Sequence, residues 1–127
     1  MLGYNLLTGY DWVSSNVANA ALMHHERADG SGYPMGTKGN SKNMYVSVVA
    51  VADVFDAVTS NRVYSTKMSP YSAADILWQE SFGKLDPNIS KLFYDKISSF
   101  YVGNEVLLSN NEIGVVIFVD PSQPTRP

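Results

Sequence analysis

The segment from Ser41 to Arg62 limits the fold more than any other part of this chain. Its apolar residues recur at steps of three and four, the spacing that lines side chains along one face of an α-helix. They are Met44, Val48, Val51, Ala52, Phe55 and Val58. An apolar face of this length has to be packed against other elements, so we expect a well-packed helix in a small, mainly helical domain.

Similar signals predict the other elements of the chain. Three more helices are expected. They are Asp11 to about Glu26 with Ser14 or Ser15 as cap, Pro70 to about Phe82 with Ser69 as cap, and Pro87 to about Phe100 with Asp86 as cap. Residues 29–43 are rich in glycine and predict an irregular loop. Two β-branched runs around the polar turn 109–112 predict a C-terminal β-hairpin. We therefore expect a bundle of about four helices over residues 1–100, a hairpin over 101–120 and an extended tail over 121–127.

Composition and charge exclude several classes of protein. The 127 residues suffice for one domain, and 45% apolar with 17% charged residues is typical of a soluble globular protein. The absence of cysteine, of a long apolar run and of a signal peptide favours the cytoplasm. A net charge of -3 argues against DNA binding, yet five basic and three acidic residues lie between Arg27 and Lys67. This local excess of +2 suits a small anionic ligand, although ordinary surface scatter would also produce it.

The chain has two histidines, and they are adjacent: His24 and His25, at the end of the first predicted helix. Neutral imidazole is a common metal ligand. On a regular helix the two side chains would point about 100° apart, and each would then suit a different metal ion unless the helix ends there. Alternatively the pair caps the helix, because an imidazolium is favoured at a helix C-terminus. The sequence leaves both interpretations open.

Two aspartates, Asp53 and Asp56, stand three residues apart on one face of the central helix, within the apolar run VSVVAVADVFDAV. A carboxylate in apolar surroundings needs a cation, because burying it unpaired is very unfavourable. Arg62 is one candidate cation. The other is a metal ion held jointly with the histidines.

The loop GSGYPMG, residues 30–36, follows the histidines directly. It has some likeness to a dinucleotide-binding fingerprint, but it follows a helix rather than a strand and its spacing is wrong. We expect it to bring backbone amides and the Tyr33 hydroxyl close to a ligand beside the histidines. A plain surface loop is the alternative.

Taken together, these motifs resemble those of the HD-GYP family of bacterial phosphodiesterases. The resemblance rests on HHERADGSGYP from His24 to Pro34, on VADVFDA from Val51 to Ala57, and on TSNRVY from Thr59 to Tyr64. It extends through GKLDPNISKLF to the terminal hairpin and so covers nearly the whole chain.

The resemblance implies an HD-type, metal-dependent phosphohydrolase that converts cyclic di-GMP to pGpG or GMP with two or three metal ions, most often iron or manganese. It implies that the metal ligands are His24, His25 and Asp53. Asp53 and Asp56 would take catalytic roles, with Asp56 orienting Arg62 or a histidine. Substrate contacts are implied for Gly32, Tyr33, Pro34, Arg62 and Lys67. A protein partner, the diguanylate cyclase domain, is implied at the loop of residues 30–36, called the GYP loop below.

The family takes its name from a His-Asp pair upstream of these motifs, and this chain does not contain that pair. We therefore expect the C-terminal part of such a domain, weak or inactive alone, whose exposed apolar helices favour a homodimer. The alternative function is a non-catalytic module of bacterial second-messenger signalling that binds a nucleotide or a protein partner.

Overall fold

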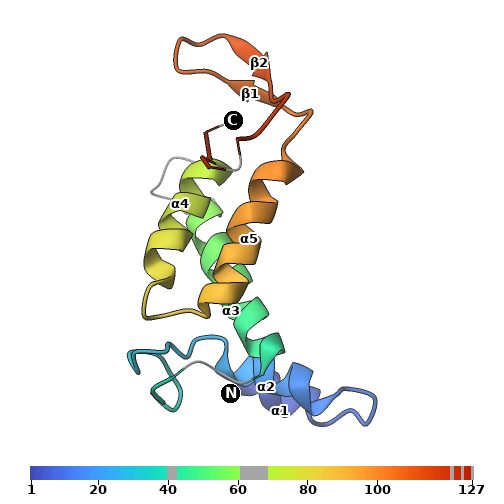
Figure 1. The fold of residues 1–127 in the computed structure, drawn as a ribbon. Coiled ribbons are helices and arrows are strands. Elements are labelled where there is room, and N and C mark those ends of the chain that lie inside the picture. Colours follow the sequence, from blue (N-terminus) through green and yellow to red (C-terminus); the bar gives the residue numbers. More distant parts are fainter. Residues whose placement is uncertain (40–42, 61–68, 121, 124, 127) are drawn as a thin grey trace.

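The computed structural model describes residues 1–39, 43–60, 69–120, 122–123 and 125–126. Within these ranges it contains five helices and one two-stranded sheet, which are α1 (Leu2–Leu7), α2 (Ser15–Met23), α3 (Met44–Thr59), α4 (Pro70–Ser81), α5 (Pro87–Phe100), β1 (Glu105–Leu107) and β2 (Ile113–Val115). Helices α3, α4 and α5 lie alongside one another, α1 and α2 lie at one end of α3, and the hairpin lies at the opposite end of the molecule (Figure 1). The predicted helical domain with a C-terminal hairpin is confirmed.

The predicted caps set the starts of three helices. The hydroxyls of Ser14 and Ser69 each accept a hydrogen bond from the backbone N–H three residues later, at 3.4 and 3.1 Å. Asp86 Oδ1 accepts from the N–H groups of Asn88 and Ile89, at 2.9 and 3.1 Å. These bonds satisfy N–H groups in the first helical turns, and α4 and α5 begin where the sequence predicts. Helix α2 begins at Ser15 and ends at Met23, so it is shorter than the predicted range of Asp11 to about Glu26.

Helix α3 is central, but its buried face differs from the predicted one. The buried residues are Val46, Ser47, Ala50 and Val51, whereas Met44 is 64% exposed and Val48 is 46% exposed. The segment is apolar on almost every side, so more than one stripe satisfies the three-and-four spacing, and packing decides between them. The predicted stripe is therefore wrong in the first two turns and at Ala52, which is exposed.

The core lies where α3, α4 and the α4–α5 connection meet. It consists of Ala50, Val51, Leu77 and Leu85, with Leu77 completely buried. Two partly buried aromatic rings pack against this cluster, Phe55 and Phe93, whose centroids lie 4.9 Å apart in an edge-to-face arrangement. Burial of these groups fixes α3 relative to α4 and α5.

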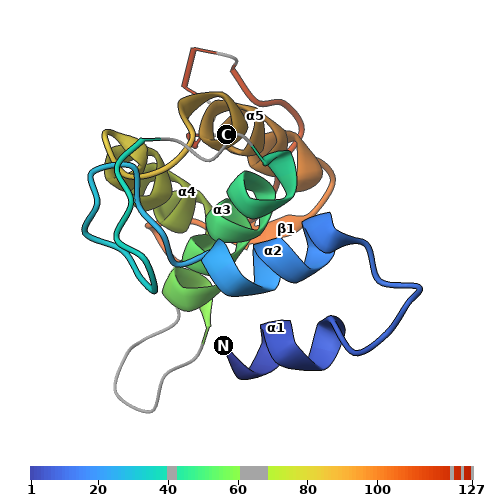
Figure 2. The same cartoon turned by 90° about the horizontal axis from the view of Figure 1, so that it is seen from below.

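Helix α1 is an addition to the four predicted helices. It spans six residues and buries none of them. Because it is so short, its sequence shows no apolar period. It lies beside α2 (Figure 2). Leu2, Leu6 and Trp12 are 90%, 64% and 81% exposed, which agrees with the predicted association of the chain but does not test it. None of the described helices is both long and apolar enough to cross a bilayer.

The hairpin pairs β1 with β2 in antiparallel register, with Val106 opposite Gly114. The predicted polar turn joins the two strands. Within it, Asn111 has a φ of 66°, a left-handed conformation that asparagine tolerates better than most residues.

Shortening the most buried core side chain tests this packing. We expect Leu77→Ala to lower the free energy of unfolding by about 2–5 kcal/mol, because it leaves a cavity between α3 and α4. Leu92→Ala is the matched control, since Leu92 also lies in a helix but is 56% exposed and should change stability by less than about 1 kcal/mol. Chemical denaturation followed by circular dichroism measures both, and equal losses would contradict this description of the core.

Candidate metal centre

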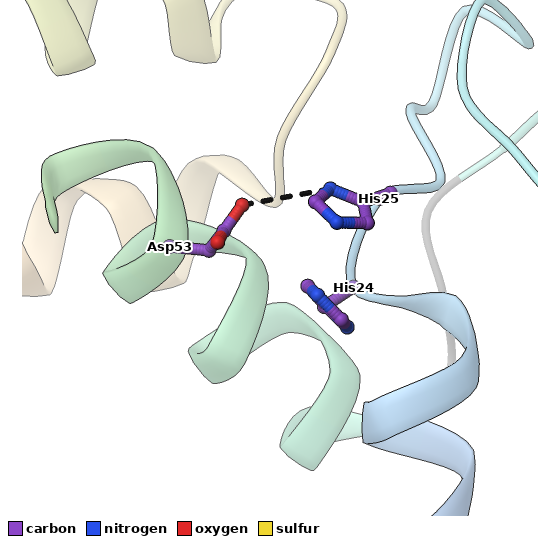
Figure 3. Close-up of side chains that lie close together, drawn as sticks. All are labelled: His24, His25 and Asp53. Atoms are coloured by element: carbon purple, nitrogen blue, oxygen red, sulfur yellow. Dashed lines mark ion pairs between the residues drawn. The ribbon is translucent and has the colours of Figure 1, made fainter. Parts of the chain in front are cut away.

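The two histidines lie where α2 ends. Met23 is the last helical residue, and His24 is the C-terminal cap with φ -63° and ψ -16°. The chain leaves the helix immediately afterwards, and the two imidazole rings then lie 4.1 Å apart with their planes inclined by 40°. The relaxed geometry that the sequence left open is therefore the one adopted, and both rings lie near α3 (Figure 3).

His24 combines the two roles that the sequence analysis kept apart. Its Nδ1 lies 2.9 Å from the carbonyl oxygen of Ala20, one turn earlier in α2. A carbonyl can only accept, so Nδ1 carries a proton, and in the neutral ring this leaves the lone pair on Nε2. Histidines that bind metals usually hold their second nitrogen in this way. The helix-capping contact thus prepares His24 to act as a ligand.

Asp53 joins the histidines from the neighbouring helix α3. Its Oδ2 lies 3.5 Å from His25 Nδ1, and both side chains are partly exposed, at 39% for Asp53 and 33% for His25. One potential ligand atom from each of His24, His25 and Asp53 lies within 4.8 Å of the other two. Two imidazoles and a carboxylate are a donor set that suits zinc, iron and manganese, so these residues fit a divalent transition-metal ion.

The surroundings of His25 favour its neutral form. Desolvation by burial, followed by the neighbouring His24 and Arg27, lowers the pKa of His25, while Asp53 acts in the opposite direction. Only the neutral imidazole has a lone pair to give to a metal. The ring also stacks on Tyr33, with centroids 4.6 Å apart and planes 27° from parallel. This contact limits rotation of the imidazole beside Asp53.

Asp56 does not share the environment of Asp53. It is exposed, so the expectation that both carboxylates are buried in the apolar run is wrong for Asp56. A step of three residues turns a helix by about 300°, so the side chains of Asp53 and Asp56 point about 60° apart around the helix axis. Its predicted role in orienting Arg62 stays a prediction, because Arg62 and Lys67 lie outside the described residues.

The GYP loop folds back onto His25. The N–H of Tyr33 donates to the carbonyl oxygen of His25 at 3.3 Å. A Cβ atom at Gly32 would lie 2.3 Å from that same oxygen and 2.4 Å from the nitrogen of Arg27, so only glycine permits the approach. Gly32, Tyr33 and His25 are therefore brought together, while Pro34 and the Tyr33 side chain are exposed. The proposed contact of this loop with a diguanylate cyclase domain stays a prediction.

Glu26 anchors this loop, a structural role that the sequence analysis missed. Its carboxylate accepts hydrogen bonds from the backbone N–H groups of Met35, Gly36 and Thr37, the last two at 3.3 and 3.2 Å. The loop is thus wrapped around a negative charge next to the histidines. An acidic residue between a histidine pair and a glycine-rich loop was the signal that could have indicated this, since such loops offer unpaired amides.

Arg27 was also missed as a structural element of the site. Its Nη1 donates to the carbonyl oxygens of His24 at 3.0 Å and Glu26 at 2.9 Å. These two bonds fix the backbone immediately after α2. Glu26 and Arg27 therefore hold the histidine pair from both sides, one through the loop and the other through the main chain.

Comparison with known proteins agrees with this geometry. The family model described as HD domain matches residues 2–89. A cyclic di-GMP phosphodiesterase of Pseudomonas aeruginosa is 34% identical over 117 residues, which are 91% of this chain and 28% of that protein. The cyclic di-GMP phosphodiesterase response regulator RpfG of Xanthomonas campestris is 42% identical over 87 residues, 68% of this chain and 23% of that protein. The 3'3'-cGAMP-specific phosphodiesterase 1 of Vibrio cholerae is 38% identical over 88 residues, 68% of this chain and 20% of that protein.

These relatives are much longer than the chain described here. It spans between a fifth and about three tenths of their length. The predicted resemblance to cyclic di-GMP phosphodiesterases is confirmed at the level of the family.

The charges around His25 can be tested by titration of the metal-free chain. We expect the pKa of His25 to lie below the ordinary value of about 6.5. Asp53→Asn should lower that pKa further, because it removes a stabilising negative charge, and Arg27→Gln should raise it, because it removes a repelling positive charge. Proton NMR of the imidazole C–H signals in the presence of EDTA follows both. Shifts of the same sign in the two variants would contradict this arrangement of charges.

The anchoring role of Glu26 predicts a local effect of its removal. In Glu26→Ala the amides of Met35, Gly36 and Thr37 lose their acceptor, so their hydrogen exchange should accelerate by about tenfold or more. Glu105→Ala is the control, because Glu105 is an exposed side chain on the distant hairpin. Exchange by mass spectrometry or NMR makes the measurement, and unchanged rates at residues 35–37 would show that the carboxylate does not hold the loop.

Proposed function

Because this chain belongs to the HD domain family, we propose that it supplies part of the metal-dependent site of a cyclic-dinucleotide phosphodiesterase. One observation supports the proposal most strongly: potential ligand atoms of His24, His25 and Asp53 converge to within 4.8 Å from two different elements. The helix-capping contact of His24 and the neutral form favoured at His25 both agree with metal binding. Iron or manganese is the metal proposed, with two or three ions in the complete site.

The chemistry of a phosphodiester explains why such a site is needed. A divalent metal ion, when bound, acts as a Lewis acid that offsets the phosphate charge and makes water a better nucleophile at neutral pH. The residues of this chain do the positioning. His24 and Asp53 present donor atoms from α2 and α3, and Tyr33 restricts the ring of His25 by stacking on it. Asp56 is proposed to orient Arg62 or a histidine without binding the metal.

The proposed substrate is cyclic di-GMP, with pGpG or GMP as the product. Two of the relatives described above are named for cyclic di-GMP and the third for 3'3'-cGAMP, so both compounds belong to the test. Gly32, Tyr33 and Pro34 are proposed to contact the substrate from the loop that lies against His25. Arg62 and Lys67 are proposed to contact it as well, and they follow α3 in the sequence.

Measuring the metal content of this 127-residue chain is the first test of the proposed ligands. Protein purified without oxygen and without chelating resin should contain at least about one iron or manganese per chain by elemental mass spectrometry. His24→Ala, His25→Ala and Asp53→Asn should each lose most of it, because each removes one of three ligands. Glu105→Gln is the control and should retain the metal, since Glu105 is exposed on strand β1 and lies outside the group. Equal metal content in all variants would contradict the proposed ligands.

Hydrolysis is then measured by chromatography of cyclic di-GMP and 3'3'-cGAMP incubated with the metal-loaded chain. We expect slow turnover that EDTA abolishes, because three protein ligands hold less metal than the complete site of the family. A chain without metal that still binds cyclic di-GMP in equilibrium dialysis would refute the phosphodiesterase proposal and favour the non-catalytic nucleotide-binding module.

A further inference from the structure

A cavity of about 310 Å³ lies directly beside the metal group. Its walls come from the end of α2 and the GYP loop, from α3, and from the C-terminal part of α4 with the connection that follows. His25 and Tyr33 form one side, and Arg27, Glu80 and Lys84 line the rest together with apolar and small residues. His25 thus belongs both to the metal group and to the cavity wall, so a ligand in the cavity would lie next to the metal group.

Arg27 brings a fixed and unneutralised charge to this cavity. The hydrogen bonds found for it in the described part of the chain are those from Nη1 to two backbone carbonyls, and no carboxylate there pairs with it. A guanidinium has five N–H donors, so most of its hydrogen-bonding capacity remains for another acceptor. The two backbone contacts hold the side chain in place, which reduces the entropy lost when an anion binds.

Lys84 and Glu80 add one charge of each sign. Lys84 Nζ lies 2.6 Å from Glu80 Oε2, and both side chains are about half exposed. Counting Arg27 and Lys84 as +2 and Glu80 as -1, the arginine, lysine and glutamate side chains of the lining carry a net charge of +1. The nearby Asp29 is not part of the lining, and its Oδ1 already accepts hydrogen bonds from the backbone N–H and the hydroxyl of Ser31.

We propose that this cavity is an anion subsite in which Arg27 and Lys84 bind a phosphate group of the ligand. The inference rests on the proposed function, since it adds a second phosphate position to a site whose first lies at His24, His25 and Asp53. A cyclic dinucleotide carries two phosphates, and a ligand with phosphates at both positions would lie across His25. Arginine suits this task because its planar fork matches the geometry of phosphate oxygens.

Inorganic phosphate is the probe for the subsite, because its binding can be measured with EDTA present and without any metal. In NMR titrations at constant ionic strength, phosphate should shift the amide signals of Gly32, Tyr33 and Lys84. Lys84→Gln should weaken binding by about fivefold, because it removes one positive charge at contact distance. Glu80→Gln should strengthen it by a similar factor, because it removes the competing carboxylate.

A matched control comes from α5. Lys91 forms the same kind of exposed pair with Asp95, at 2.8 Å and four residues apart, but does not line the cavity. Lys91→Gln should leave phosphate binding unchanged. Signal shifts spread over the surface, or equal weakening in Lys84→Gln and Lys91→Gln, would overturn the proposal. Opposite effects of Lys84→Gln and Glu80→Gln would support it, since a general loss of folding cannot produce them.

His24→Ala separates this inference from the proposed function. His24 belongs to the metal group but does not line the cavity, so the variant should lose metal and still bind phosphate. Phosphate binding without metal binding in the unmodified chain would refute only the proposed function. Metal binding without phosphate binding would refute only the anion subsite.

Discussion

The hydrogen bond between His24 Nδ1 and the carbonyl oxygen of Ala20 is the contact on which the site depends. The same carbonyl also accepts the backbone N–H of His24 at 3.1 Å, so the side-chain contact adds a second hydrogen bond at the end of α2 and places the proton of the neutral ring on Nδ1. The last helical residue is Met23 and His24 is the cap, so His25 lies outside the helix. The side chain of His25 can therefore turn toward Asp53 on α3. Had α2 continued for another turn, the two rings would point about 100° apart and only one could face Asp53.

The loop that follows is organised around a close contact of main chain with main chain. Gly32 approaches the backbone of residues 25–27 so closely that no side chain fits between them. The carboxylate of Glu26 accepts hydrogen bonds from three amides of the same loop. Arg27 Nη1 donates to the carbonyl oxygens of His24 and Glu26. Donors and acceptors that a glycine-rich loop would otherwise expose are thus satisfied locally. The loop and the histidines form one unit, so a ligand that contacts Tyr33 also senses the position of His25.

The sequence was informative where a local rule has one solution. Ser14, Ser69 and Asp86 each cap a helix because an unpaired N–H needs an acceptor nearby, and this requirement can be read without a structure. It was ambiguous for α3, where valine and alanine on almost every side allow several buried faces, and Met44 was placed on the wrong one. The ligand group followed from motif resemblance rather than from periodicity. Glu26 was missed because an acidic residue before a glycine-rich loop is only a general signal, and the amides that it binds depend on how the loop folds back.

The position of Asp53 depends on how closely α2 and α3 pack. Aspartate has a short side chain, so it reaches an imidazole on another helix only if the two elements lie near each other. Both buried residues of α2, Ala18 and Ala20, are small, and α3 buries Ser47 and Ala50 together with Val46 and Val51. Small side chains at a helix contact shorten the distance between the axes. Ala50 and Val51 also belong to the core that holds α3 against α4. The 3.5 Å separation of His25 and Asp53 is therefore a consequence of packing over most of the helical domain.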